Sequence, residues 1–507
     1  MGSDVALLLV NSQAADLAEI PVHSISVFRD HIINRVREGA RLSALFGRSL
    51  PDKTIYLMGV LSQPSEGTLS LLATVVGDSF PSLTPDCPAA HWFEREIAEQ
   101  WGVKPIGHPW LKPIRFHRPY QGWKDIWGWN PREAVKPGVT QFFQVQGEEI
   151  HEVAVGPVHA GVIEPGHFRF NCHGETVLHL EVSLGYQHRG VEKALINGPD
   201  KKTIHMMETL AGDTSVGHAT AYCHALEALA GCRVPARGQM LRTIALELER
   251  LANHTGDLGA LAGDIGFLPT ASYCGRLRGD YLNLTALLCG SRFGRGMVRP
   301  GGTQFDMDPS RLEIFLVNLE KAQRDTKRAV EMLWDTPSVT ARMEKVGVLS
   351  KAQAVELGLV GPAARACGLG VDVRFDFPAG GYALAQFPVS SYESGDIFAR
   401  AYVRWLEIER SVAFIREGVK TLPDGPTRAR VEAIPESKVV VSLVEGWRGE
   451  ICHVAMTGSQ GKFDRYKVVD PSFHNWMGLS MAMRNQQISD FPLCNKSFNL
   501  SYCGHDL

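Results

Sequence analysis

The sequence predicts an α+β protein, in which a mixed α/β unit precedes a larger unit of long helices with small β-sheets. Short apolar runs near the N-terminus have the length of strands, whereas later segments carry apolar residues at three-to-four spacing. Pairs of alternating segments separated by turn residues add small sheets to the helical part. With 507 residues, the chain is long enough for about two to four domains.

Composition and charge exclude several classes of protein. A hydrophobic content of 44% and a charged content of 21% are typical of a soluble globular chain. The net charge of −3 provides no field that would attract nucleic acid, so no nucleic-acid partner is expected. No apolar run approaches the ~18 residues of a membrane span, and Ala6–Val10 is too short for a signal peptide. We therefore expect an intracellular chain that other subunits hold at any membrane.

Two common kinds of cofactor motif are missing from the sequence. The ten cysteines are scattered, and no two of them form a C-x-x-C pair. Scattered cysteines in an intracellular chain are most often small buried residues. No Gly-rich phosphate loop stands between a strand and a helix, so the chain is not expected to bind NAD or another nucleotide.

Residues 1–118 are predicted to form the first unit. Apolar runs predict strands over Val5–Val10, Thr54–Leu61 and Leu69–Val76, and an amphipathic pattern predicts a helix over Val27–Gly47. Residues 119–140 follow as a connector, because tryptophan, glycine and proline exclude one regular element there. Its three tryptophans, Trp123, Trp127 and Trp129, are expected to pack on a surface.

Residues 141–507 are predicted to form the second, mainly helical unit. Expected helices cover Pro199–Leu229 (with a break near Ala211–Gly217), Arg237–Ala260, Arg276–Ser291, Pro309–Leu333 and Asp396–Glu417. The last of these begins at Ser394-Gly395-Asp396, which predicts an N-cap. A hairpin is expected from Val439–Leu443 and Ile451–Met456. The charged residues of the ELER segment, Glu247, Glu249 and Arg250, are interpreted with His254 as ties between helices.

The stretch Gly156–Lys193 carries five histidines and has the pattern of a hairpin. Phe168–Asn171 and Thr176–Glu181 alternate on either side of the His173-Gly174 turn. Glu164 and His167 flank Pro165-Gly166, a dipeptide that turns the backbone. The stretch is therefore either a hairpin with an ordinary polar loop or a loop that delivers side chains to a site.

Ordered motifs along the chain resemble two subunits of respiratory complex I. The segment AHWFEREIAEQWGV with the later GHP is similar to the 30-kDa (C-type) family. The 49-kDa (D-type) family and the large subunits of group 4 membrane-bound [NiFe]-hydrogenases are similar to GPVHAGVIEPGHFRF, LGYQHRGVEK, VPARGQMLRTIALELERLANHTGDLG, SGDIFARAYVRWLEIERS, EGWRGE, DPSFHNW and SDFPLCNKSFNLSYCG. The resemblance covers nearly the whole chain. It implies a C/D fusion: a 30-kDa-like α/β domain and a hydrogenase-large-subunit-like domain of long helices with small sheets.

The resemblance also implies where a metal would be bound. In the hydrogenases two C-x-x-C pairs hold nickel and iron as thiolate ligands. Matching GHATAY and SFNLSYCG to the family places these ligands at Ala211, Thr214, Ser501 and Gly504, none of which is cysteine. The single thiol of Cys503 cannot rebuild such a site, so no nickel–iron centre is expected. The chain most resembles energy-converting-hydrogenase-related proteins that keep the scaffold without the metal ligands.

In complex I the corresponding cavity receives a quinone headgroup. The quinone-binding tyrosine of that family falls at Gly212, and the aspartate that partners its quinone-facing histidine falls at Asp264. Glu164 resembles the hydrogenase glutamate that passes protons, although a turn acceptor would have the same pattern. The resemblance implies catalytic roles for Glu164, His167, His159 and Asp264. It implies a metal-free, quinone-like cavity formed by Gly212, Asp213, Thr214, His218 and Ser501.

The function that the resemblance implies is a peripheral electron-transfer subunit at the cytoplasmic face of a membrane. It would reduce a quinone or a related acceptor, coupled to proton or sodium translocation. Implied partners are an iron–sulfur small subunit similar to the B-type one of complex I, a ferredoxin-like subunit, antiporter-like membrane subunits and an H-type membrane anchor, with the iron–sulfur clusters in the partners. Two alternatives are a non-catalytic scaffold, which predicts a site collapsed by bulky side chains, and a hydrogenase with unusual ligands.

Overall fold

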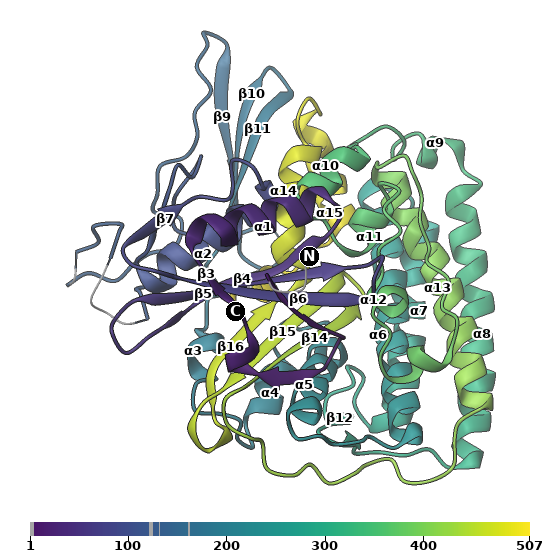
Figure 1. Cartoon of the computed structure of the whole chain (residues 1–507). Helices are drawn as coiled ribbons and strands as arrows, with labels where there is room; N and C mark the ends of the chain where they lie inside the picture. Colours follow the sequence, from purple (N-terminus) through teal and green to yellow (C-terminus); the bar gives the residue numbers. More distant parts are fainter. Residues whose placement is uncertain (1–4, 121–124, 131, 161–162) are drawn as a thin grey trace.

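The computed structural model describes residues 5–120, 125–130, 132–160 and 163–507, and it confirms the α+β class (Figure 1). The N-terminal part is built on a five-stranded sheet in the order β1-β6-β5-β4, with β3 paired to β6. Its strands are β1 (Leu7–Leu9), β3 (Val22–His23), β4 (Arg41–Ser49), β5 (Ile55–Gln63) and β6 (Thr68–Val76). Helix α1 (Ile25–Arg37) covers β5, and its Phe28 and Ile32 are fully buried against Gly59. The predicted strands are thus confirmed.

The helix predicted over Val27–Gly47 is wrong in its second half. Helix α1 ends at Arg37, and Gly39 has a φ of +103°, a conformation that favours glycine. Strand β4 then pairs antiparallel with β5, from Arg41 opposite Ser62 to Ser49 opposite Ile55. The apolar run 42–46 is buried on both faces of the sheet, and this pairing outweighs its helical spacing.

The N-terminal part also supplies a strand to the C-terminal sheet. That sheet has the order β16-β15-β14-β2, where β2 (Ala14–Asp16) pairs with Lys438–Val440. Strands β14 (Lys438–Gly446) and β15 (Gly449–Thr457) form the predicted hairpin, and β16 (Phe463–Val469) follows. A strand of the N-terminal part therefore belongs to the C-terminal sheet, so this sheet does not separate two units. The predicted domain limits at residues 118 and 140 stay predictions.

Buried ion pairs join the two parts behind this sheet. Helix α2 (His91–Trp101) is buried along nearly its whole length, and its Glu96 accepts from Lys467 of β16 at 2.6 Å. Glu192 accepts from Arg465 at 2.8 Å and lies 3.0 Å from Lys467. Buried charges of this kind are tolerated because each has a partner of opposite sign.

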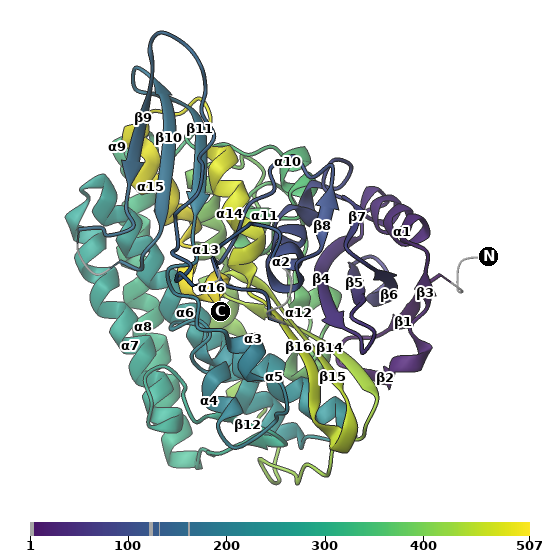
Figure 2. The same ribbon diagram turned by 90° about the vertical axis from the view of Figure 1, so that its left-hand side faces the viewer.

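Long helices form the other side of the molecule (Figures 1 and 2). They are α6 (Ala236–Ile265), α7 (Leu268–Cys289), α8 (Pro309–Trp334) and α13 (Ile397–Lys420), while α5 (Ser215–Leu229) packs against β14 and β15. Helix α6 packs against α7 and α13, and α7 packs against α8. At the start of α13, the Asp396 side chain accepts from the Ala399 N–H at 2.8 Å, which confirms the predicted N-cap. The predicted break is confirmed too, because α4 (Thr203–Met207) and α5 flank a non-helical segment, 208–214.

A three-stranded sheet projects from the body of the molecule (Figures 1 and 2). Its strands are β9 (Ile150–Val155), β10 (His167–His173) and β11 (Thr176–Ser183), in the order β11-β10-β9. The predicted hairpin around His173-Gly174 is therefore confirmed. The loop between β9 and β10 lies at the base of this sheet, against the C-terminal segment: a Cβ on Gly166 would lie 2.4 Å from the Tyr502 ring.

The remaining elements are mostly short. They are β7 (Ser79–Pro81), β8 (Lys104–Ile106), α3 (Val191–Ala194), β12 (Val298–Arg299), β13 (Gly302–Thr303), α9 (Pro337–Thr340), α10 (Lys351–Glu356), α11 (Gly361–Arg365), α12 (Val373–Asp376), α14 (Pro471–Ala482), α15 (Phe491–Phe498) and α16 (Tyr502–Asp506). In the described part of the connector no helix or strand forms, and the ring centres of Trp127 and Trp129 lie 6.2 Å apart; Trp123 lies outside the described residues. None of the helices in the described ranges combines the length and hydropathy needed to cross a bilayer.

Candidate functional site

A cavity of about 610 Å³ lies between the β9–β10 loop, the end of α6, the β14–β15 turn and the C-terminal segment. We call it the central cavity. Its polar lining residues are His159, Glu164, Asp213, Asp264, Arg448, Asn495, Lys496 and Asn499, and its apolar ones include Ile163, Phe168, Phe491, Leu500 and Tyr502. Four predicted site residues, from three distant segments of the chain, therefore meet here: His159, Glu164, Asp213 and Asp264.

The loop residues Glu164 and His159 hold the cavity wall together as well as lining it. The Glu164 carboxylate accepts from the backbone N–H groups of Tyr502 at 3.3 Å and Cys503 at 3.2 Å. The Nε2 atom of His159 lies 3.0 Å from the Gly166 carbonyl oxygen. The loop is thus tied to the C-terminal segment, which encloses the cavity from this side.

A bidentate ion pair forms one wall of the central cavity. The Arg448 guanidinium donates to both carboxylate oxygens of Asp213, at 2.6 and 2.8 Å, and stacks 3.9 Å from the Trp447 ring centre. The Trp447 indole N–H donates to the Asp213 carbonyl oxygen at 3.1 Å. Burial opposes the charged guanidinium, but Asp213 raises the pKa of Arg448 above its ordinary value. The cavity therefore has a fixed cation with a defined orientation.

Asp264 and Lys496 supply a second pair of opposite charges. Asp264 belongs to the last turn of α6, where a carboxylate is disfavoured by the helix dipole. Partial burial raises the pKa of Asp264, while the charge of Lys496 acts against that rise. The side chain is therefore more easily protonated than an ordinary aspartate.

Gly212, Thr214 and Ser501 adjoin the central cavity without lining it. The Thr214 hydroxyl donates to the Asp213 carboxylate at 3.2 Å. The Ser501 hydroxyl accepts from the Gly504 N–H at 2.9 Å and so caps α16. A Cβ placed on Gly212 would meet no atom within 4 Å, so a larger side chain has room there.

Two predicted site histidines lie outside the central cavity. His167 is fixed on β10, where its Nδ1 lies 3.1 Å from the Gly156 carbonyl oxygen and its Nε2 accepts from Arg169 at 3.3 Å. This pattern specifies a neutral ring with the proton on Nδ1, and burial lowers the pKa of His167 accordingly. Its neighbour is the Phe142 ring, 5.1 Å away, rather than the cavity.

His218 belongs instead to a fully buried chain of hydrogen bonds. Its Nε2 lies 3.0 Å from the Asp470 carboxylate and its Nδ1 lies 3.0 Å from His453 Nε2. The other His453 nitrogen lies 2.9 Å from the Tyr466 hydroxyl. Burial lowers the pKa of His453 well below its ordinary value, so this ring is neutral. The chain of hydrogen bonds joins α5, β15 and β16 beneath the C-terminal segment.

A second set of charged residues lies between α6, α13 and β14. Its members are at most 2% exposed, and we call them the buried ion cluster: Glu247, Arg250, Arg365, Asp372, Arg374, Glu407 and Glu445. Glu407 accepts from Arg365 at 2.6 Å and lies 2.9 Å from His254 Nε2. Burial disfavours the charged form, but these partners lower the pKa of Glu407 well below its ordinary value. The ties predicted for Glu247, Glu249, Arg250 and His254 are confirmed, with Glu249 bonded to the start of α5 instead of to this cluster.

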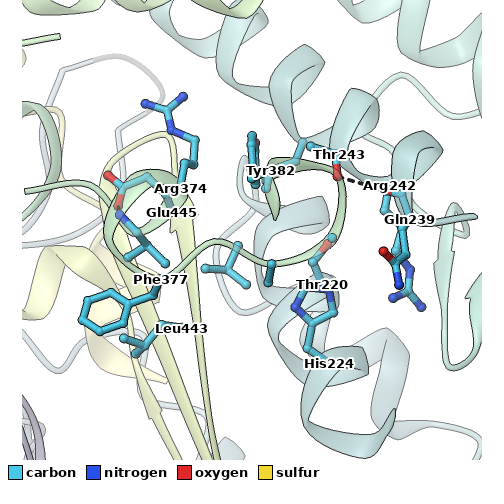
Figure 3. Close-up of a pocket in the computed structure, with 15 residues that line it drawn as sticks. Thr220, His224, Gln239, Arg242, Thr243, Arg374, Phe377, Tyr382, Leu443 and Glu445 are labelled. Atoms are coloured by element: carbon cyan, nitrogen blue, oxygen red, sulfur yellow. Dashed lines mark hydrogen bonds between the residues drawn. The ribbon is translucent and has the colours of Figure 1, made fainter. Parts of the chain in front are cut away.

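A small cavity beside the buried ion cluster has a volume of only about 20 Å³. Figure 3 shows Thr220 and His224 from one helix on one side of it, with Glu445 and Phe377 on the other. Such a volume holds about one water molecule, which excludes an organic ligand. The central cavity is therefore the better candidate site.

Three charged contributors to this region were not predicted as site residues: Arg448, Lys496 and Asp470. Each of them lies inside a longer family motif that does not single it out. The sequence pattern that could have indicated Arg448 is an arginine next to a tryptophan in the tight turn between two predicted strands. Its partner Asp213 lies 235 residues earlier, a separation that no local pattern spans.

Comparisons with known proteins match both halves of this architecture. The family described as respiratory-chain NADH dehydrogenase, 30 Kd subunit, matches residues 46–126, and the 49 Kd subunit family matches residues 264–439. The carbon monoxide-induced hydrogenase of Rhodospirillum rubrum is 33% identical over 351 residues, covering 69% of this chain and 97% of that protein. The chain belongs to the complex I 30-kDa/49-kDa and hydrogenase large-subunit family.

Other members of this family agree with that assignment. The NADH-quinone oxidoreductase C/D subunit of Bdellovibrio bacteriovorus is 30% identical over 382 residues, covering 73% of this chain and 68% of that protein. A chain of the membrane-bound sulfane sulfur reductase, an archaeal respiratory membrane complex, has the same fold: its TM-score is 0.67 at 23% identity, over 71% of this chain and 99% of that chain.

The residues of this family member do not fit a nickel–iron centre. Ala211 and Gly504 have no donor atom, and a Cβ on Gly504 would lie 2.7 Å from the Asp470 carboxylate. Burial raises the pKa of the Cys503 thiol to about 11, so the one nearby sulfur stays protonated. Among the described residues, no three His, Cys, Asp or Glu side chains are grouped to hold a metal ion.

Proposed function

We propose that this chain is the acceptor-site subunit of a complex I-like membrane oxidoreductase, and that the central cavity binds and reduces a quinone or a related acceptor. The observation that carries the proposal is an open cavity with an oriented cation, next to the positions where hydrogenase members would hold metal. Its volume falls within the ~300–1,000 Å³ range of small-molecule sites, which combine apolar walls with a few polar groups.

The lining suits a flat ring that carries two oxygens. Phe168, Phe491 and Tyr502 offer ring surfaces, and the cations of Arg448 and Lys496 line the same cavity, where they would stabilise negative charge on an acceptor oxygen. Asp264, with its raised pKa, holds a proton more readily than an ordinary aspartate and can donate it. The residues thus provide binding, charge stabilisation and one proton donor.

Electrons would come from an iron–sulfur small subunit, and reduction would be coupled to proton or sodium movement through antiporter-like membrane subunits. A ferredoxin-like subunit and an H-type membrane anchor would complete the assembly at the cytoplasmic face of the membrane. Family membership supports this arrangement, because relatives include a membrane-bound hydrogenase and NADH-quinone oxidoreductase subunits. A non-catalytic scaffold would be expected to fill the site with bulky side chains, so the open cavity favours the acceptor hypothesis.

The test uses the purified assembly with a photoreactive short-chain quinone. Labelling should fall on the β9–β10 loop or on residues 491–502, and the assembly should reduce the quinone with one of NADH, formate or hydrogen as donor while its metals are measured. Ile163→Trp narrows the cavity and should weaken quinone binding about tenfold. Val158→Trp is the matched control, because Val158 is 89% exposed on the same loop. Labelling outside the cavity, or equal effects of both variants, would refute the proposal.

A further inference from the structure

Asp213 forms a wall shared by two cavities. One side of it lines the central cavity, and the other lines a side cavity of about 20 Å³ between α5, α6 and α7. The polar residues of the side cavity are Asp213, Glu249, Asn253, Arg278, Thr285 and Arg292. A cavity of this size, with this many polar partners, holds about one water molecule.

The side cavity leads from Asp213 toward the surface. Arg292 is exposed, and Phe293 beside it is 44% exposed. The Arg278 Nε atom is buried and, among the described residues, has no hydrogen-bond partner. An unpaired buried donor of this kind is costly unless water satisfies it, which supports hydration of the side cavity.

Glu249 is the group in the side cavity that can hold a proton. Its carboxyl group lies at the start of α5, where it accepts from the backbone N–H groups of Val216 at 2.7 Å and Gly217 at 3.1 Å. The charged groups that face it are Asp213 from the preceding loop, Arg250 from its own helix, and Arg278 and Arg292 from the α7 side. Burial raises the pKa of Glu249 to about 8, and Asp213 adds to the rise. Near neutral pH this residue therefore carries a proton.

We propose that Glu249 delivers protons to the central cavity through a water molecule in the side cavity and the Asp213 carboxylate. This inference rests on the proposed function, since it supplies the protons that acceptor reduction consumes. Glu249, the second acid of the ELER segment, then has a role in proton transfer. Glu247, the first acid, has a structural role, because its partners are Arg250 and Arg374.

The route accounts for every proton and electron that quinone reduction consumes. Reduction of a quinone to a quinol takes two electrons, from the iron–sulfur cluster of the partner, and two protons. For each proton, the Glu249 O–H bond breaks, the water takes that proton and gives one to Asp213, and the Asp213 O–H bond then breaks as the acceptor oxygen is protonated. Glu249 regains a proton from solvent on the Arg292 side. Arg448 stabilises the Asp213 carboxylate between transfers.

The decisive variant is Glu249→Gln, measured as quinone reduction by the whole assembly from pH 6 to 9. Glutamine keeps an oxygen that accepts a backbone N–H but holds no transferable proton. We expect kcat to fall about tenfold or more, in line with the usual effect of losing a proton-transfer group. KM should stay within about twofold, because Glu249 does not line the central cavity, and the solvent isotope effect on kcat should increase.

The matched control is Glu94→Gln. Glu94 is also a buried glutamate whose pKa is raised by burial, and it accepts from the Leu83 N–H at 2.7 Å, but it lies in the N-terminal part. Its variant should leave kcat and the pH profile unchanged. Infrared difference spectra of wild type against Glu249→Gln should show a protonated carboxyl band that disappears near pH 8.

Each alternative outcome is distinct. An active wild type with unchanged kcat and pH profile in Glu249→Gln would overturn the route and leave the proposed function standing. A raised KM with unchanged kcat would show that Glu249 only shapes the start of α5, which also overturns it. A wild type that neither binds nor reduces quinone would refute the proposed function, and the route with it.

Discussion

The central cavity and the buried ion cluster are made from the same residue types but use them in opposite ways. In the cluster, Arg365, Arg374 and Glu407 are at most 2% exposed and bind other side chains of the cluster. In the cavity, Asp213 is about one-third exposed, and Asp264 and Lys496 line an open volume of about 610 Å³.

The difference shows how a single chain separates structural charge from functional charge. A charge whose hydrogen-bonding capacity is filled by its own chain contributes to packing and specificity. A charge that borders unfilled space keeps capacity for a ligand. Burial alone does not identify a site; charge that borders a cavity large enough for a ligand does.

The largest expected effect is a loss of folding stability when the buried ion cluster is disrupted. Glu407→Ala removes the carboxylate that partners Arg365 and His254, and the buried Arg365 guanidinium keeps only its carboxylate contacts with Glu445 and Asp372. The free energy of unfolding should fall by about 3–5 kcal/mol, measured by chemical denaturation of the whole chain. Arg410→Ala, on the exposed face of the same helix, is the control and should change it by less than ~0.5 kcal/mol. Equal effects would contradict the assignment of the cluster to structure.

The next test compares two glycines at the family ligand loops. Gly504→Ala places a Cβ 2.7 Å from the Asp470 carboxylate, whereas Gly212→Ala meets no atom within 4 Å. Gly504→Ala should destabilise the chain by about 1–3 kcal/mol, as overpacking does, and Gly212→Ala should be close to neutral. Thermal unfolding of the two variants side by side checks the contrast, and a tolerant Gly504 would contradict it.

Two glutamates should give pH dependences of opposite sign. Glu249 has a pKa raised from 4.5 to about 8, so between these values the native state keeps a proton that the unfolded chain releases. Its contribution to stability is present below about pH 4.5 and is lost as pH rises through 8, at up to about 1.4 kcal/mol per unit. Glu407, with a lowered pKa, contributes above 4.5 and loses that contribution as pH falls.

Denaturation midpoints of wild type, Glu249→Gln and Glu407→Gln from pH 2 to 9 check these signs. Glu249→Gln should flatten the fall in stability between pH 5 and 8. Glu407→Gln should flatten only the acid limb. A variant that flattens the other limb would show that the charge environment of its residue has been misassigned.

The smallest expected effect is a gain in quinone affinity. Gly212→Tyr adds a hydroxyl beside the central cavity, at the position that the resemblance matches to a quinone-binding tyrosine, and a Cβ there meets no atom within 4 Å. One added hydrogen bond is worth about 1 kcal/mol, so quinone affinity should rise by about fivefold. Gly212→Phe is the control and lacks the hydroxyl. Equal affinities of the two variants would contradict a hydrogen-bonding role for this position.

Local patterns predict most of the fold because they depend on neighbours in the chain. The β10–β11 hairpin, the Asp396 N-cap and the long helices follow from alternation, capping chemistry and apolar spacing. Local patterns do not predict the strand at 41–49. A continuous apolar run fits the period of a helix as well as that of a strand, and only its pairing with β5 decides between them.

The site is harder to predict because its contacts are long-range. Glu247 and Glu249 are two residues apart on one helix, about 200° around its axis, so they face different neighbours. In the sequence the two acids look alike, and only their contacts with α5 (Glu249) and α13 (Glu247) distinguish them. Likewise, His218 is placed near the site by its position in a motif, while its partners Asp470 and His453 come from far along the chain.

The crossing strand β2 has a consequence for how such a fusion is maintained. Residues 11–17 cover the outer edge of β14: Ser12 N–H donates to Val441 O at 2.9 Å, and Leu17 N–H donates to Ser437 O at 2.8 Å. A C-terminal part expressed alone would expose that edge, which is a template for aggregation. Covalent linkage keeps the covering segment at high effective concentration. The N-terminal segment thus protects the sheet edge from aggregation. Its removal should first reduce the solubility of the protein, before any change in the site is measured.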